Sequence, residues 1–197
     1  MPYKYLDNNL KKTKSKQLNT LKILKINMRW HGITGSWRTT NEIVEKDVIN
    51  RVKNIISKGD GIVSGGALGV DYIATKTALD YGNFEQIKLF LPIQKYDFME
   101  HYFKRHEEGI ISIGQAKDIT KQLYNINEIS PESIIDNTAY TQANSKSYYA
   151  RNSQIVEISD ILEAFQVNDS LGVEDTIKKA KNKGIPINLK KYNIKLN

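Results

Sequence analysis

The apolar positions of the chain follow two patterns that alternate along it. Short continuous apolar runs are typical of buried parallel strands, and apolar residues at every third or fourth position are typical of helices that cover a sheet. The runs predict strands over 28–34, 61–64, 87–92, 161–167 and 185–189. The repeats predict helices over 41–58, 68–81, 149–160 and a last one that ends at 182–184. This order predicts an α/β fold with a mostly parallel sheet of about five strands and right-handed crossovers.

Local signals support these boundaries. Thr40 or Asn41 is a good N-cap for the first helix, and glycines follow the first two helices at Gly59 and Gly82. Pro186 cannot donate a backbone hydrogen bond, so the last strand is expected at an edge of the sheet.

Residues 28–190 are long enough to bury a core and predict a single domain, with 191–197 as a tail. Residues 1–27 are polar and lysine-rich and predict a basic N-terminal arm with little packed structure. Residues 93–149 are rich in charged and aromatic residues and predict a helical and loop insertion. Insertions of this length are usually functional or mobile, and this one could fold over a ligand site.

Within this insertion, helical spacing is expected over 96–108 and 110–124, and a loop over 125–147. His101 and His106 do not share one helical face, and no metal site is expected there. A third histidine, His31, lies in the first predicted strand and is expected to be packed or exposed rather than catalytic.

Glycine-bearing loops follow two of the strands, at 32–40 and 64–71, and a third polar turn lies at 168–176. Glycine allows a close backbone approach, and a helix that begins after such a loop presents free N–H groups and a positive dipole end. A phosphate suits that position, so a branched side chain at Gly66 is expected to block binding and spare the sheet. The alternative is that these glycines only turn the chain.

The composition narrows the chemistry. The chain has no cysteine, which excludes disulfides, thiolate catalysis and cysteine-based metal sites. No run approaches the roughly 20 apolar residues of a membrane span, and a secretory signal is not expected, so we expect a cytoplasmic protein without a membrane partner. The 29 Lys and Arg against 22 Asp and Glu give a charge of +7, much of it before Asn27. These lysines could attract nucleic acid or reflect a compositional bias.

Four motifs occur in an order that resembles the SLOG superfamily of Rossmann-like proteins. They are Gly35-Ser36-Trp37-Arg38, the stretch 65–71, Arg151-Asn152, and the strand at 160–165 with Gly172 and the closing stretch 180–187. The YspA-like branch is the most similar, with the DNA-processing protein DprA and the LOG phosphoribohydrolases as more distant relatives. The resemblance implies a Rossmann-like three-layer fold and a nucleotide or nucleotide-derived ligand over the glycine loops.

The residue pattern and the resemblance together give a set of candidate site residues. The expected ligand-binding residues are Gly35, Ser36, Arg38, Ser64, Gly65, Gly66, Ala67, Gly69, Asp71, Arg151, Asn152, Ser170, Gly172 and Thr176. The candidate acids or bases are Asp71, Glu174 and Asp175. Asp71 has a structural alternative, because a carboxylate in a first helical turn stabilises the helix dipole.

Binding or sensing of a nucleotide-like ligand is the function that these observations favour, with no certain cofactor. A nucleotide-processing hydrolase of the LOG type and DNA binding through the lysine arm are the alternatives. The LOG enzymes carry a Pro-Gly-Gly-x-Gly-Thr stretch, whereas the turn at 170–176 has one glycine, which argues against phosphoribohydrolase activity. The resemblance implies an arginine directly after the serine of the first loop, whereas in this sequence Trp37 stands between Ser36 and Arg38. A homo-oligomer is left open.

Overall fold

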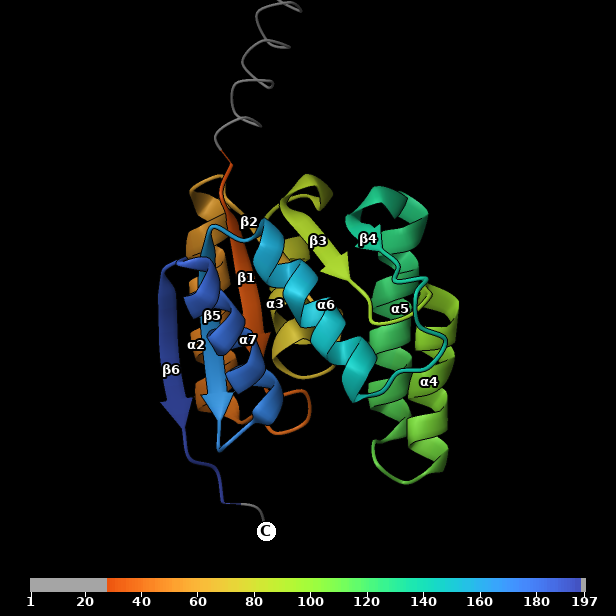
Figure 1. The fold of residues 1–197 in the computed structure, drawn as a ribbon. Coiled ribbons are helices and arrows are strands. Elements are labelled where there is room, and N and C mark those ends of the chain that lie inside the picture. Colours follow the sequence, from red (N-terminus) through yellow and green to blue (C-terminus); the bar gives the residue numbers. More distant parts are fainter. Residues whose placement is uncertain (1–27, 196–197) are drawn as a thin grey trace, which may run out of the picture.

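The computed structural model describes residues 28–195, which form a six-stranded, entirely parallel sheet (Figure 1). The strand order is β4-β3-β2-β1-β5-β6. The strands are β1 (Trp30–Gly35), β2 (Gly61–Ser64), β3 (Ile87–Phe90), β4 (Ile134–Ile135), β5 (Ile161–Val167) and β6 (Ile187–Tyr192). The helices are α2 (Glu42–Ser57), α3 (Val70–Tyr81), α4 (Lys95–Glu107), α5 (Ile113–Ile129), α6 (Ser145–Ile158) and α7 (Leu171–Lys183). Short 3-10 turns, Phe84–Gln86 and Pro131–Ser133, precede β3 and β4.

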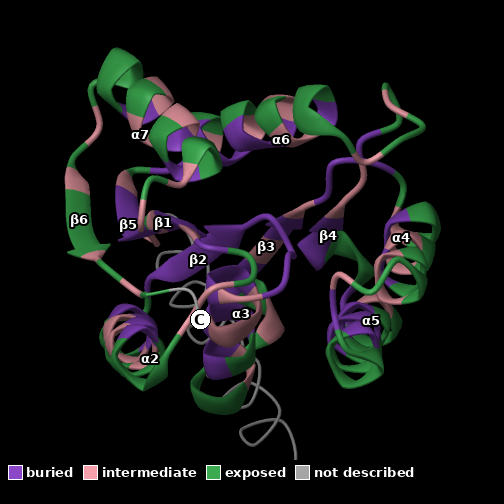
Figure 2. Cartoon of the chain, turned by 90° about the horizontal axis from the view of Figure 1, so that it is seen from below, coloured by how far each residue is buried: buried purple, intermediate pink, exposed green. Residues whose placement is uncertain are grey.

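Helices cover both faces of the sheet and make three layers (Figure 2). On one face, α2, α3 and the α4–α5 pair enclose the larger apolar core, in which Phe98 of α4 and Leu123 of α5 are fully buried. On the other face, α6 and α7 pack on β5 through a smaller cluster that includes Leu162. The α/β class and the layered arrangement predicted from the sequence are therefore confirmed.

Side-chain caps set several helix boundaries. The Asn41 side chain accepts a hydrogen bond from the Val44 amide at 3.1 Å and begins α2, as the sequence predicts. Ser112 with Gln115 and Asn144 with Ser147 form reciprocal capping boxes that begin α5 and α6. These two boxes define where the second and last helices of the 93–158 region start.

The structure corrects the description of residues 125–147 as a loop. Helix α5 continues to Ile129, and β4 pairs with β3 at one edge of the sheet. A strand of two residues has no periodicity of its own, so the sixth strand could not be read from the sequence. The opposite edge is β6, which confirms the edge position that Pro186 predicts.

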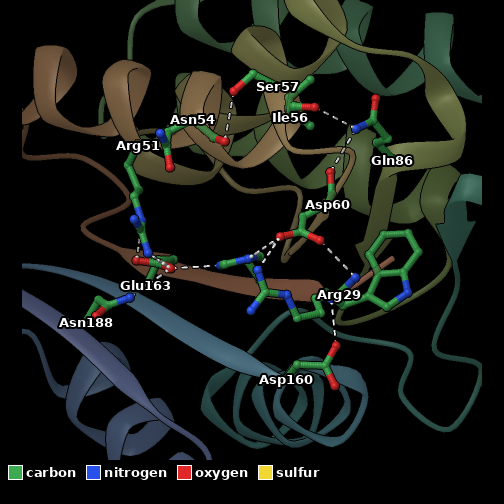
Figure 3. A network of polar contacts seen from close by, with 12 residues as sticks. Arg29, Arg51, Asn54, Ile56, Ser57, Asp60, Gln86, Asp160, Glu163 and Asn188 are labelled. Atoms are coloured by element: carbon green, nitrogen blue, oxygen red, sulfur yellow. Dashed lines mark hydrogen bonds and ion pairs between the residues drawn. The ribbon is translucent and has the colours of Figure 1, made fainter. Parts of the chain in front are cut away.

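A buried polar cluster lies near the amino ends of β1 and β2 and contains His31 (Figure 3). The His31 ring nitrogens lie 2.8 Å from Glu163 and 3.4 Å from Asp60. Arg51 of α2 donates two hydrogen bonds to Glu163, at 2.6 and 2.8 Å, and Arg29 pairs with Asp60 at 3.0 Å. His31 is thus buried between two carboxylates, which is the packed one of the two positions expected for it.

The basic arm predicted over 1–27 lies outside the described residues. Within 28–195, no helix has both the length and the apolar character needed to cross a membrane.

Candidate ligand-binding site

A cavity of about 440 Å³ opens where β1, β2 and β5 end. Its walls come from the loops after these strands and from α4 and α6. Seven of the predicted residues line it, namely Gly35, Ala67, Asp71, Arg151, Asn152, Ser170 and Gly172. The three glycine-bearing segments of the sequence therefore meet at one place, at the carboxyl edge where open α/β sheets bind ligands.

At the base of the cavity, Arg151 of α6 lies against the central glycine loop. A Cβ atom at Gly65 would be only 1.0 Å from Arg151 Nη1, so any other residue here would force the guanidinium out of this position. The Gly65 amide donates to the Asp71 carboxylate at 3.0 Å, and Arg151 Nη1 lies 3.5 Å from the same oxygen. Part of the loop's anion-binding capacity is thus used by its own carboxylate.

Asp71 is buried in this arrangement. Burial raises its pKa above the ordinary value, although the charge of Arg151 and the amides of Gly65 and Ala67 act in the opposite direction. Asp71 lies in the first turn of α3, the position that the predicted helix-dipole role requires, and its carboxylate also holds the loop and faces Arg151. It also lines the cavity, so a role toward a ligand stays a prediction.

Arg151 has more donors than the structure satisfies. The residue is 9% exposed, its Nε has no hydrogen-bond partner within the described part of the chain, and its contact with Asp71 is long. The Tyr148 ring lies 5.6 Å from the guanidinium carbon. A guanidinium carries five N–H donors in a planar fork, and burying them unpaired is unfavourable. An anion that enters the cavity would supply the missing acceptors.

The amino end of α7 forms another part of the wall. Ser170 precedes the helix without a capping hydrogen bond from its side chain, and Gly172 has open space where a Cβ would project. Asn152 donates to Asp175 at 3.0 Å and lies 3.4 Å from the Gly172 carbonyl, which ties α6 to the first turn of α7. The partial positive charge of this helix end adds to that of Arg151.

Helix α4 supplies cavity residues that were not among the predicted ones, His101, Tyr102 and Arg105. The Tyr148 hydroxyl lies 3.3 Å from His101 Nε2, and Tyr102 accepts a hydrogen bond from the Leu68 amide at 3.2 Å. Burial raises the pKa of Tyr102, which keeps its hydroxyl protonated. The sequence predicted that the aromatic and charged segment after residue 93 could fold over the site. It did not indicate which residues of this segment would line the cavity.

Trp37, Tyr148 and Tyr149 also line the cavity and were missed as site residues. Trp37 and Tyr149 are 38% and 40% exposed, so these two residues are partly open to solvent, and Lys179 Nζ lies 5.5 Å from the centre of the Tyr149 ring. Arg38 stacks on Trp37, with its guanidinium carbon 4.6 Å from the ring centre, and does not line this cavity. The intervening tryptophan thus displaces the arginine of the first loop from the site.

The remaining predicted residues do not line the cavity and have structural contacts. Gly66 has a φ of 58°, and a Cβ there would lie 2.7 Å from Leu91 in the core. This contradicts the expectation that a side chain at Gly66 would occupy a phosphate position. Gly69 also has a positive φ, of 70°, and begins α3. Besides these two and Arg38, the predicted residues outside the lining are Ser36, Ser64, Gly65, Thr176, Glu174 and Asp175.

The contacts of these residues explain why. Ser36 accepts from the Thr39 amide, Ser64 contacts Thr75 at 3.4 Å, and Thr176 donates to the Gly172 carbonyl. Asp175 is paired with Lys179 at 2.6 Å, and Glu174 is exposed near Gln166. Neither carboxylate faces the cavity as a general acid or base would. Residues 28–195 contain no cluster of three or more potential metal ligands.

The fold and this cavity define an α/β protein of the Rossmann-like kind. Among solved structures, the chain is similar to DNA processing protein A from Helicobacter pylori, with 21% identity and a TM-score of 0.58 over 83% of this chain and 66% of that one. It is also similar to the molybdenum cofactor binding protein from the phototrophic bacterium Rippkaea orientalis, with 16% identity and a TM-score of 0.51 over 86% and 78%.

These neighbours have SLOG-type Rossmann-like folds, which confirms the fold that the resemblance implies. The chain spans just under two thirds of the length of DNA processing protein A. No protein-family model matches the chain, and no curated protein matches it. The YspA-like branch stays a prediction.

Proposed function

We propose that the protein binds a nucleotide or nucleotide-derived ligand in the cavity at the carboxyl ends of β1, β2 and β5. The buried, incompletely paired guanidinium of Arg151 is the observation that carries this proposal. A phosphate oxygen accepts from a guanidinium in the same way as a carboxylate does, and it would relieve the unpaired donors.

The aromatic residues support the nucleotide class over a simple anion. A base is a flat π-system, and stacking on an aromatic side chain stabilises it by about 1–3 kcal/mol. Trp37 and Tyr149 offer exposed rings on the same cavity that holds Arg151. A volume of about 440 Å³ also lies within the range of small-molecule sites and exceeds what a lone phosphate would fill.

Calorimetric titration with nucleoside mono- and diphosphates, NAD and ADP-ribose tests the proposal. We expect micromolar binding of at least one nucleotide, and no release of base or phosphate on long incubation. Multiple-turnover hydrolysis that Asp71→Asn abolishes would instead establish an enzyme, because Asp71 is the one candidate carboxylate on the cavity.

Nucleic acid is the second candidate, favoured by the charge of +7. DNA processing protein A from Helicobacter pylori binds single-stranded DNA. The same titration therefore includes a single-stranded oligonucleotide at low and moderate salt. Salt-sensitive binding of the oligonucleotide, without binding of any nucleotide, would favour this candidate over ours.

Two glycine variants separate a folding defect from a binding defect. Gly66→Val is expected to lower the free energy of unfolding by about 2–5 kcal/mol, because it forces a branched residue into a positive φ and against Leu91. Gly172→Val is expected to leave stability nearly unchanged and weaken nucleotide binding, because its side chain enters open space at the cavity. Urea unfolding and calorimetry measure the two effects. An unchanged nucleotide affinity of the Gly172→Val variant would show that the amino end of α7 does not take part in binding.

A further inference from the structure

The α4 side of the cavity contains basic residues that a single phosphate bound to Arg151 would leave without a ligand contact. His101 and Arg105 are four residues apart on α4, hence on one helical face, and both line the cavity with Arg151. The Tyr148 hydroxyl contacts His101, and the Tyr148 ring lies beside Arg151, so this tyrosine connects the α4 wall with Arg151.

Counting the charges on the wall gives an excess of positive charge. Among the described residues that line the cavity, the arginines are Arg105 and Arg151, and Asp71 is the one carboxylate. Asp71 already faces Arg151 and accepts from the Gly65 amide. Arg105 is paired with Glu108, at 2.9 Å, and both side chains are about a third exposed. An exposed pair of this kind contributes little, so Arg105 can exchange Glu108 for a ligand.

We propose that the cavity takes a ligand with two anionic groups, one held by Arg151 and the other by His101 and Arg105 of α4. The proposal rests on the proposed function and narrows its ligand class to nucleoside diphosphates and their esters. It also gives the α4–α5 segment a role, since α4 supplies the second contact.

The environment of His101 gives the proposal a second readout. Burial and the neighbouring Arg105 and Lys104 lower the pKa of His101, and Glu108 opposes them. From α6, the neutral Tyr148 hydroxyl contacts the ring, and the charge of Arg151 lies beyond it. His101 is therefore largely neutral at pH 7.5. A bound anion favours the protonated ring, so the affinity for a ligand with two anionic groups should rise as the pH falls and the ring becomes protonated.

The test compares the terminal methyl esters of adenosine 5′-diphosphate and adenosine 5′-monophosphate. These probes differ by one phosphate and carry two charges and one charge that do not titrate in this range. Arg105→Met is expected to weaken the diphosphate ester about tenfold and the monophosphate ester less than about twofold. Lys104→Met, which removes an exposed charge from the same helix outside the cavity lining, is the matched control for the affinities at pH 7.5, where His101 is neutral. His101→Gln should abolish the rise in diphosphate affinity at low pH.

The outcomes separate this inference from the function on which it rests. If Arg105→Met and Lys104→Met lower the affinities for both esters equally, only the overall positive charge of α4 contributes. That result would overturn the second contact. Binding of both esters with equal affinity to the native protein, dependent on Arg151 but not on α4, would overturn the inference and leave the proposed function standing. Binding of neither ester would count against both.

Discussion

The Arg151→Met variant is expected to bind nucleotides about ten- to a hundredfold more weakly than the native protein. The native guanidinium is 9% exposed, lines the cavity and has an unpaired Nε, so a bound phosphate would gain charged hydrogen bonds that methionine cannot make. A hydrogen bond to a charged group contributes about 1.5–3 kcal/mol, which corresponds to this range of affinity. Calorimetry with the nucleotide that binds most tightly measures the change.

Arg29→Met is the matched control, because it makes the same substitution at an exposed arginine that does not line the cavity and lies at the amino end of β1. It should change the affinity by less than about twofold, as expected of a surface charge screened by salt. Arg151→Lys should give an intermediate affinity, since the charge is kept and the planar fork is lost. Equal affinities for Arg29→Met and Arg151→Met would show that Arg151 is not part of the binding site.

A loss of folding must be distinguished from a loss of binding at this position. Removing Arg151 leaves the Asp71 carboxyl buried without its cation, and burial already raises the pKa of that group. The double variant Asp71→Asn/Arg151→Met removes both charges. If the double variant has the same melting temperature as the native protein and still fails to bind nucleotide, the guanidinium itself is required for binding. Recovery of native affinity in the double variant would show that Arg151 acts only through Asp71.

The sequence predicted the sheet better than it predicted the site. Strand and helix patterns are encoded locally, so β1, β2, β3, β5 and β6 and their helices could be recognised from apolar spacing. The two-residue β4 carries no such spacing and obtains its register from β3. The edge position of β6 was predicted from Pro186, which cannot donate a hydrogen bond and lies directly before the strand.

In the site, motif reading found the loops but not the direction of each side chain. Gly65 and Gly66 are adjacent and look equivalent in the sequence, yet one lies against Arg151 and the other faces Leu91 in the core. The cavity residues of α4 could not be predicted from the sequence for a different reason. His101 and Tyr148 are 47 residues apart and meet only through tertiary packing, so no local spacing indicates their contact.

The second large effect concerns stability, at the far end of the sheet from the cavity. Glu163→Gln is expected to lower the free energy of unfolding by about 3 kcal/mol. The Glu163 carboxylate is 2% exposed and accepts hydrogen bonds from Arg51 and Asn188 while facing His31 (Figure 3). Breaking a buried ion pair by removing one partner costs about 3–5 kcal/mol, and the lower end applies because Arg51 is a third exposed.

The same group makes stability depend on pH. Burial alone would raise the pKa of Glu163, but hydrogen bonds from His31, Arg51 and Asn188 outweigh it and hold this pKa below its ordinary value of 4.5. The pKa of Asp60 is held low in the same way by Arg29 and His31, against the effect of burial. A carboxyl with a lowered folded-state pKa contributes stability above its unfolded-state pKa, and that contribution is lost as the pH falls through the folded-state value.

Urea unfolding at several pH values measures both effects. We expect the native protein to lose stability progressively below about pH 4.5, and Glu163→Gln to lose less over the same interval because its amide does not titrate. Glu128→Gln, at an exposed position on α5, is the control and should match the native curve. An acid dependence that is identical in Glu163→Gln and the native protein would mean that other carboxylates govern the transition. A free energy of unfolding unchanged at neutral pH would mean that the glutamine amide of the variant replaces the ion pair without loss, as hydrogen bonding within a polar cluster can allow.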